Sequence, residues 1–206
     1  MLQSTTKKKL TVKECAAKYQ NSEMRSSINQ CAQLYLQTFC DHPGQSHSSH
    51  ELIPMNASRG KLIANCFDAL CHTPEEKKTR VSYQQLIKEV QQQYNFAEYC
   101  MGIKFEPWFG DKEPYDSSCT MFADMHDNHH LYFLPTISHF GSQTATPDNY
   151  MLNITNVFIN DYQLSVNDMF RAIHDLIVHA MKGNGFGHVR EEKARYAHLQ
   201  FLSPLE

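Results

Sequence analysis

The chain has 206 residues, of which 41% are hydrophobic and 20% charged, and this predicts one main domain with a hydrophobic core. Its 19 Lys and Arg and 22 Asp and Glu residues are mixed along the sequence and give a formal net charge of -3. Such a balance offers no broad cationic surface to a phosphate backbone, so we expect no nucleic-acid binding.

The cysteines and the hydropathy pattern predict a cytoplasmic protein. Seven cysteines are an odd number and show no CxxC spacing, which indicates neither a disulfide framework nor a zinc finger. No segment reaches the roughly 18 apolar residues that a membrane span needs. The start, MLQSTTKKKLTV, also lacks the apolar stretch of a secretory signal.

Residues 1–60 are predicted to form an N-terminal arm. A polar leader is followed by a helix near residues 28–39, in which Ile28, Tyr35 and Phe39 recur at helical spacing. The segment GQSHSSHELIPMNASRG then reads as a flexible loop because it is rich in Ser, Gly and Pro. This arm is a candidate contact for a protein partner.

Residues 61–206 are predicted to form the main domain. Two helices open it, one with an apolar stripe from Leu62 to Leu70 and one from an N-cap at Ser82 to a stop at Gly102. Three short β-type runs follow, which are IKFEPW, HLYFLPT and MLNITNVFI. Helix returns at Ser165, whose capping box with Asp168 precedes MFRAIHDLIVHAMK. We expect an α+β fold that is predominantly helical with a small sheet in the middle of the chain.

The end of the chain holds the densest set of groups able to bind a metal or move a proton. His174, Asp175 and His179 lie on one predicted helix, and Glu191, Glu192 and His198 lie on the last helix, after turns at the glycines of GNGFG. At about 100° per residue, His174 and His179 are about 140° apart, whereas Asp175 and His179 share a face. Pairing of the two helices would gather these groups into one site.

The set suits Zn, Mn or Fe because imidazole and carboxylate are preferred donors for such ions. We expect Asp175, His179 and His198 to ligate the metal, with Glu191 or Glu192 as general base on a bound water. His174 would take a supporting catalytic role by holding a ligand or the helix packing in place.

Each of these residues also has an ordinary structural explanation. Asp175 with His179 is a common helix-surface ion pair, and a histidine such as His174 at the edge of a core commonly bonds to backbone. His126, Asp127, His129 and His130 could add ligands but are better explained by a polar loop before a strand. Cys119 is more typical of a buried free thiol than of a nucleophile.

From about residue 60 onward the chain resembles a poorly characterised family of proteins from phages, prophages and mobile elements. The most specific piece is NDMFRAIHDLIVHAMKGNGFGHVREEKARYAHLQFLSP, and FDAL, GIKFEPW and HLYFLPT keep the same order. The resemblance supports the domain and the cluster but implies no reaction. It also implies that the native chain continues beyond residue 204.

Two hypotheses follow. The first is a small metal-dependent hydrolase, with a peptide, nucleotide or phosphoester as substrate. The second is a non-catalytic, phage-derived structural or host-interacting protein whose histidine-rich helices form a satisfied polar core. A concave site with unpaired donors favours the first hypothesis.

Overall fold

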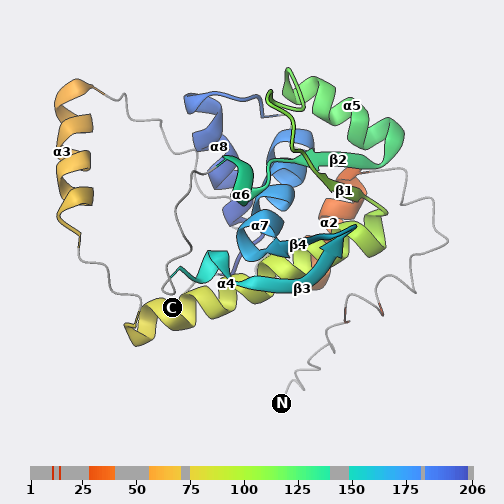
Figure 1. Ribbon diagram of the computed structural model, residues 1–206, viewed down its shortest axis with the longest axis horizontal. Coiled ribbons are helices and arrows are strands. Elements are labelled where there is room, and N and C mark those ends of the chain that lie inside the picture. Colours follow the sequence, from red (N-terminus) through yellow and green to blue (C-terminus); the bar gives the residue numbers. More distant parts are fainter. Residues whose placement is uncertain are drawn as a thin grey trace, which may run out of the picture.

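The computed structural model describes residues 28–39, 56–70, 75–139, 149–181 and 184–203, together with Thr11 and Glu14. Its main elements in chain order are α2 (Ile28–Phe39), α3 (Ala57–Asp68), α4 (Lys77–Phe96), η2 (Ala97–Met101), β1 (Lys104–Pro107), α5 (Ser118–Asn128), β2 (His130–Phe133), α6 (Thr136–His139), η3 (Tyr150–Leu152), β3 (Ile154–Ile159), β4 (Tyr162–Ser165), α7 (Val166–His174), η4 (Asp175–Met181) and α8 (His188–Leu199). Helices dominate, and the strands lie in the middle of the chain (Figure 1). The predicted α+β class is confirmed.

The strands form two separate pairs. β1 and β2 are parallel, with Phe105 opposite Leu131. β3 and β4 form an antiparallel hairpin. β4 was not predicted, because its run YQLS is short and its last residue, Ser165, is also the N-cap of the next helix.

Helix α4 is long, and α7 packs against it (Figure 1). It begins at Lys77, so the prediction of an N-cap at Ser82 is wrong. The expected stop at Gly102 is confirmed, since Gly102 has a φ of 73° and follows the π-helical turn η2. A positive φ favours glycine at such a helix end.

The core is continuous around α4, α7, η4 and the first strand pair. Val90 and Tyr94 of α4 and Leu131 and Leu164 of the strands are completely buried. Helix α2 joins this core through Leu34, Tyr35 and Leu36. A helix of the predicted arm is therefore part of the packed body.

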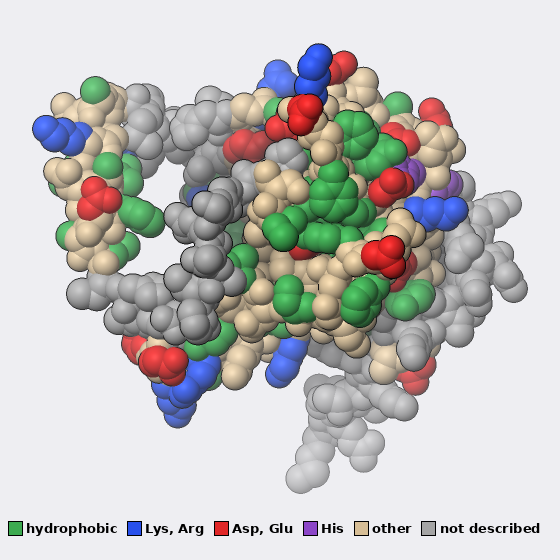
Figure 2. All heavy atoms as spheres, viewed as in Figure 1, with side chains coloured by type: hydrophobic (Ala, Val, Ile, Leu, Met, Phe, Trp, Pro, Cys, Tyr) green, Lys and Arg blue, Asp and Glu red, His purple; other side chains and the backbone are tan. Residues whose placement is uncertain are grey.

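Helix α3 has no buried residue, although it is 12 residues long. Asn56 caps it by accepting a hydrogen bond from the Arg59 amide at 2.8 Å, so it begins before the predicted domain boundary. Its apolar side chains, including Leu62 and Phe67, are exposed on a helix that stands apart from the body (Figure 2). Within the described ranges, no helix has both the length and the apolar character needed to cross a membrane.

The segment between β1 and β2 was predicted as a loop but contains helix α5. Ser117 and Thr120 form a capping box at its start, and Met121 and Met125 give it a buried side. These are recognisable helix signals. The prediction of a polar loop is wrong here because the polar residues His126 and Asp127 lie on the exposed side of this helix.

The start of α7 is anchored by the buried carboxylate of Asp168. The predicted capping box is present, with Ser165 and Asp168 bonded in both directions. The same carboxylate accepts hydrogen bonds from the backbone and hydroxyl of Thr136 and from the hydroxyl of Tyr162. Satisfying a buried carboxylate in this way fixes the helix that carries the histidines.

Candidate metal centre

A cavity of about 580 Å³ opens beside the junction of α7 and η4. Its polar lining includes Arg171, His174, Asp175, His179 and Glu191, and the rest of the lining is formed by Glu113, Pro114, Tyr115, Met121, Tyr132, Leu134, Phe170 and Phe186. The side chain of Glu191 is 44% exposed, so the polar groups can be reached from solvent.

A π-helical segment brings His174 and His179 together. α7 ends at His174 and η4 continues the helix from Asp175 to Met181. In a π-helix the hydrogen bond links residues i and i+5, so side chains five residues apart are stacked on one side. The two imidazole rings lie 5.2 Å apart between centroids. The predicted separation of about 140° is therefore wrong, because it assumed an α-helix.

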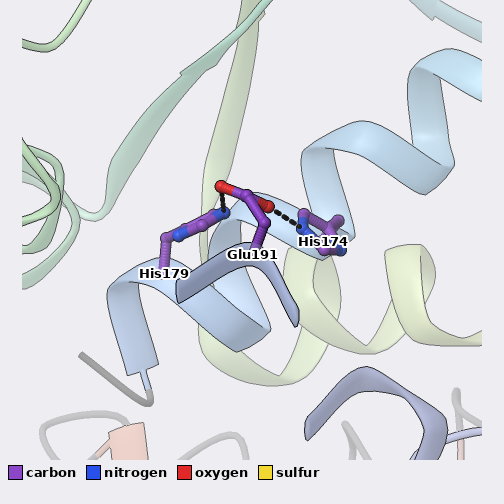
Figure 3. Close-up of side chains that lie close together, drawn as sticks. All are labelled: His174, His179 and Glu191. Carbon is purple, nitrogen blue, oxygen red and sulfur yellow. Dashed lines mark ion pairs between the residues drawn. The ribbon is translucent and has the colours of Figure 1, made fainter. Parts of the chain in front are cut away.

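Helix α8 supplies the carboxylate that completes the group. It begins after Gly187, whose φ of 106° and ψ of 152° are essentially restricted to glycine. Glu191 then lies in the first turn, and its carboxylate sits between the two imidazole rings (Figure 3). Its Oε1 is 3.3 Å from His179 Nε2, and its Oε2 is 3.6 Å from His174 Nε2.

The contact of Nδ1 determines the tautomer of His179 when its ring is neutral. His179 Nδ1 is 2.9 Å from the backbone carbonyl oxygen of Asn184. A carbonyl oxygen can only accept, so Nδ1 must carry the proton. In a neutral ring, the lone pair is then on Nε2, which faces Glu191. The Phe186 ring packs edge-on against this imidazole at 5.0 Å and holds its orientation.

His174 makes its second contact with another histidine. Its Nδ1 is 3.4 Å from His198 Nδ1, and His198 Nε2 is 3.2 Å from Gln93 Oε1. The ring of Phe170 stacks against both imidazoles. His198 is buried, and this burial, together with the neighbouring His174, lowers its pKa to about 3. Burial is also the main reason why the pKa of His174 is lowered.

The other charged groups of the cavity wall are Asp175, Arg171 and Glu113. Burial raises the pKa of Asp175 to about 6, although the charges of His179 and Arg171 act in the opposite direction. Burial lowers the pKa of Arg171, which the charges of Asp175 and Glu113 partly oppose. Among the described residues, the lining of the cavity thus contains one arginine beside three carboxyl groups.

The predicted residues separate into three groups. His174, His179 and Glu191 come together, with one ligand atom from each lying within 4.8 Å of the others. Asp175 lines the same cavity but lies outside this group. His198 contacts Nδ1 of His174, the ring nitrogen on the side away from Glu191. The side chain of Glu192 falls outside the described part of the structure.

The further candidates lie elsewhere. His126 pairs with Asp127 on the surface of α5, and His130 Nδ1 bonds to Asp124 at 2.8 Å. His129 caps α5 with a φ of 52°. Cys119 is exposed, so the expectation of a buried thiol is wrong.

Sequence reasoning missed Gln93 and Arg171. Gln93 occupies a position three residues after Val90 and four before Ala97, on the buried side of its helix. A lone amide on an apolar stripe is a signal that could have identified it. Arg171 precedes His174 by one helical turn, which places both in the cavity wall.

Comparisons of the chain with protein-family models, curated proteins and solved structures found no match. The resemblance to phage and mobile-element proteins therefore stays a prediction. The geometry of the cavity carries the functional interpretation.

Proposed function

We propose that His174, His179 and Glu191 bind a divalent transition metal and that the protein is a small metal-dependent hydrolase. The observation that carries the proposal is the orientation of His179. Its Nδ1 proton is committed to the Asn184 carbonyl, so a neutral ring directs the Nε2 lone pair at the Glu191 carboxylate 3.3 Å away. Two acceptors face each other there, and a cation between them resolves the repulsion.

The spacing of the three residues supports this reading. Zinc bonds to histidine nitrogen at about 2.0–2.1 Å and to carboxylate oxygen at about 2.0–2.2 Å, so neighbouring ligand atoms around a tetrahedral ion lie about 3.4 Å apart. The distance from His179 Nε2 to Glu191 Oε1 is 3.3 Å and that from His174 Nε2 to Glu191 Oε2 is 3.6 Å, and both are close to that value. One ligand atom from each of the three residues lies within 4.8 Å of the others, so the side chains would draw together to bind an ion.

The charges of the cavity favour a cation as well. Arg171 is the arginine of the lining, and it stands against the carboxyl groups of Glu113, Asp175 and Glu191. With the histidines neutral, the cavity carries excess negative charge. A divalent ion would neutralise it, whereas an anionic ligand alone would increase it.

Two histidines and one carboxylate are a ligand set found in catalytic zinc sites, which leave a position open for water or substrate. A bound ion would supply a lowered pKa for that water and polarise a carbonyl or phosphoryl oxygen. Glu191 acts as a ligand in this arrangement, so the role of general base falls to Asp175, the other carboxyl beside the histidines in the cavity wall. The aromatic and apolar wall would hold the body of the substrate.

Elemental analysis of protein purified without added metal tests this proposal. Wild type is compared with a His174→Ala/His179→Ala double variant and with a His126→Ala/His129→Ala control, which removes the same number of imidazoles from the last turn of α5 and its C-cap. We expect near-stoichiometric zinc, manganese or iron in wild type and control, and none in the folded site variant.

A panel of amide, ester and phosphoester substrates then tests hydrolysis by the loaded protein. Turnover that is lost in the site variant and kept in the control supports the enzyme. Failure of wild type to take up zinc, manganese or ferrous iron under reducing conditions would contradict the metal site. Stoichiometric metal without hydrolysis, and with oxygen consumption, would instead indicate the ferrous chemistry that the same ligand set supports in oxygenases.

A further inference from the structure

The amide of Gln93 has an orientation set by a fixed backbone group. Its Nε2 donates a hydrogen bond of 2.8 Å to the carbonyl oxygen of Phe201. The reverse orientation would place two oxygens against each other, so Oε1 is the atom that faces His198. Phe201 is itself buried, with its ring packed against Tyr35 at 5.9 Å, which holds the carbonyl in place.

The orientation of Gln93 determines which nitrogen of His198 carries the proton. Gln93 Oε1 can only accept, so His198 Nε2, at 3.2 Å, must donate. His198 is buried, and its described polar contacts include no carboxylate, so the ring is neutral. Its Nδ1 is therefore an acceptor and faces His174 Nδ1 at 3.4 Å.

We propose that Gln93 and His198 are positioning residues that hold His174 with its proton on Nδ1 and its Nε2 lone pair directed at the metal position. The inference rests on the proposed metal site, which it deepens. The chain of bonds runs from the Phe201 carbonyl through Gln93 and His198 to His174, and each step fixes the next. Outer partners of this kind orient metal-binding histidines and set their basicity.

The two histidines of the site are thus held by different parts of the fold. His179 is oriented locally, by the Asn184 carbonyl five residues away. His174 is oriented through Gln93, which lies 108 residues from Phe201 in sequence. Metal affinity should therefore depend on a glutamine of α4 that does not line the cavity.

Zinc titration against a chromophoric chelator tests the inference with a Gln93→Met variant, which keeps the volume of the side chain and removes both hydrogen bonds. Gln91→Met is the matched control, because Gln91 lies on the same helix and is not buried. We expect zinc to bind Gln93→Met about 10- to 100-fold more weakly than wild type and Gln91→Met as tightly as wild type. Circular dichroism of the metal-free proteins verifies that each variant is folded.

Nitrogen-15 NMR of the imidazoles in the unmutated, metal-free protein provides a second readout that does not depend on a variant. We expect the proton of His198 on Nε2 and that of His174 on Nδ1. A His198 proton on Nδ1, or unchanged zinc affinity in Gln93→Met, would overturn the relay while leaving the metal site intact. A wild-type protein that binds no zinc, manganese or ferrous iron would overturn the relay together with the proposed function.

Discussion

Replacing Glu191 by Gln distinguishes a metal site from ordinary ion pairs of Glu191 with His174 and His179. If both imidazoles are neutral and present lone pairs to residue 191, a carboxylate there has no proton to accept in the metal-free protein. An amide has two protons to give, and Nε2 of His179 is 3.3 Å from the nearer oxygen of Glu191. The substitution should therefore stabilise the metal-free protein and weaken metal binding at the same time.

The size of both effects follows from the geometry. One new hydrogen bond to a partly exposed side chain is worth about 0.5–1.5 kcal/mol, and about 1 kcal/mol shifts Tm by roughly 2–4 °C in a domain of this size. Zinc at about 100 times its Kd adds about 2.7 kcal/mol to wild type, or roughly 5–10 °C. The Glu191→Gln variant should show little of this second shift.

Thermal unfolding at pH 8, with chelator and then with zinc, measures both quantities. This pH lies above the ordinary pKa of a histidine side chain. A lower Tm for metal-free Glu191→Gln than for wild type would show that Glu191 pairs with imidazolium. That result, combined with an equal zinc shift in both proteins, would refute the proposed role of Glu191.

Two further predictions concern the elements that support the site. Asp168→Asn should lower the free energy of unfolding, measured in urea, by about 1–3 kcal/mol. The hydroxyl groups around the carboxylate can turn to accept from an amide, but the backbone N–H of Thr136 or Ser165 loses its acceptor. An unchanged free energy of unfolding would contradict this account of the α7 cap. The pKa of Asp124 is lowered from its ordinary 3.8 because hydrogen bonds, led by that from Tyr115, outweigh the effect of burial. A carboxyl with a lowered folded pKa contributes stability that is complete above the unfolded pKa and is lost as pH falls through the folded one. The free energy of unfolding should thus decrease as the pH falls below about 4, and the decrease should be smaller in Asp124→Asn. The same dependence on pH in the variant and in wild type would exclude the contribution of Asp124.

The fold class could be predicted from the sequence because local patterns decide most of its elements. The capping box of Ser165 and Asp168 and the glycine stop at Gly102 are encoded by a few neighbouring residues, and both are confirmed. Helix α5 has equally clear signals in Ser117 and Met121, but its polar side is also typical of a loop.

The site could be predicted only in part because its geometry depends on a π-helix. The residues His174, His179 and Glu191 were recognised as candidates, but regular α-helical angles placed the two histidines apart. A π-helical segment depends on how its buried residues pack, which residue periodicity does not encode. The relay through Gln93 depends on a contact with Phe201, which only the folded chain provides.

Anomalous diffraction at the zinc absorption edge, from a crystal grown with zinc, is the most direct test of the metal centre. The account predicts a peak about 2.0–2.2 Å from His174 Nε2, His179 Nε2 and a carboxylate oxygen of Glu191. Matched data below the edge should abolish the peak if it is zinc. A zinc-loaded crystal with no peak between these residues, or with a peak held by Asp175 and His198 instead, would contradict the account.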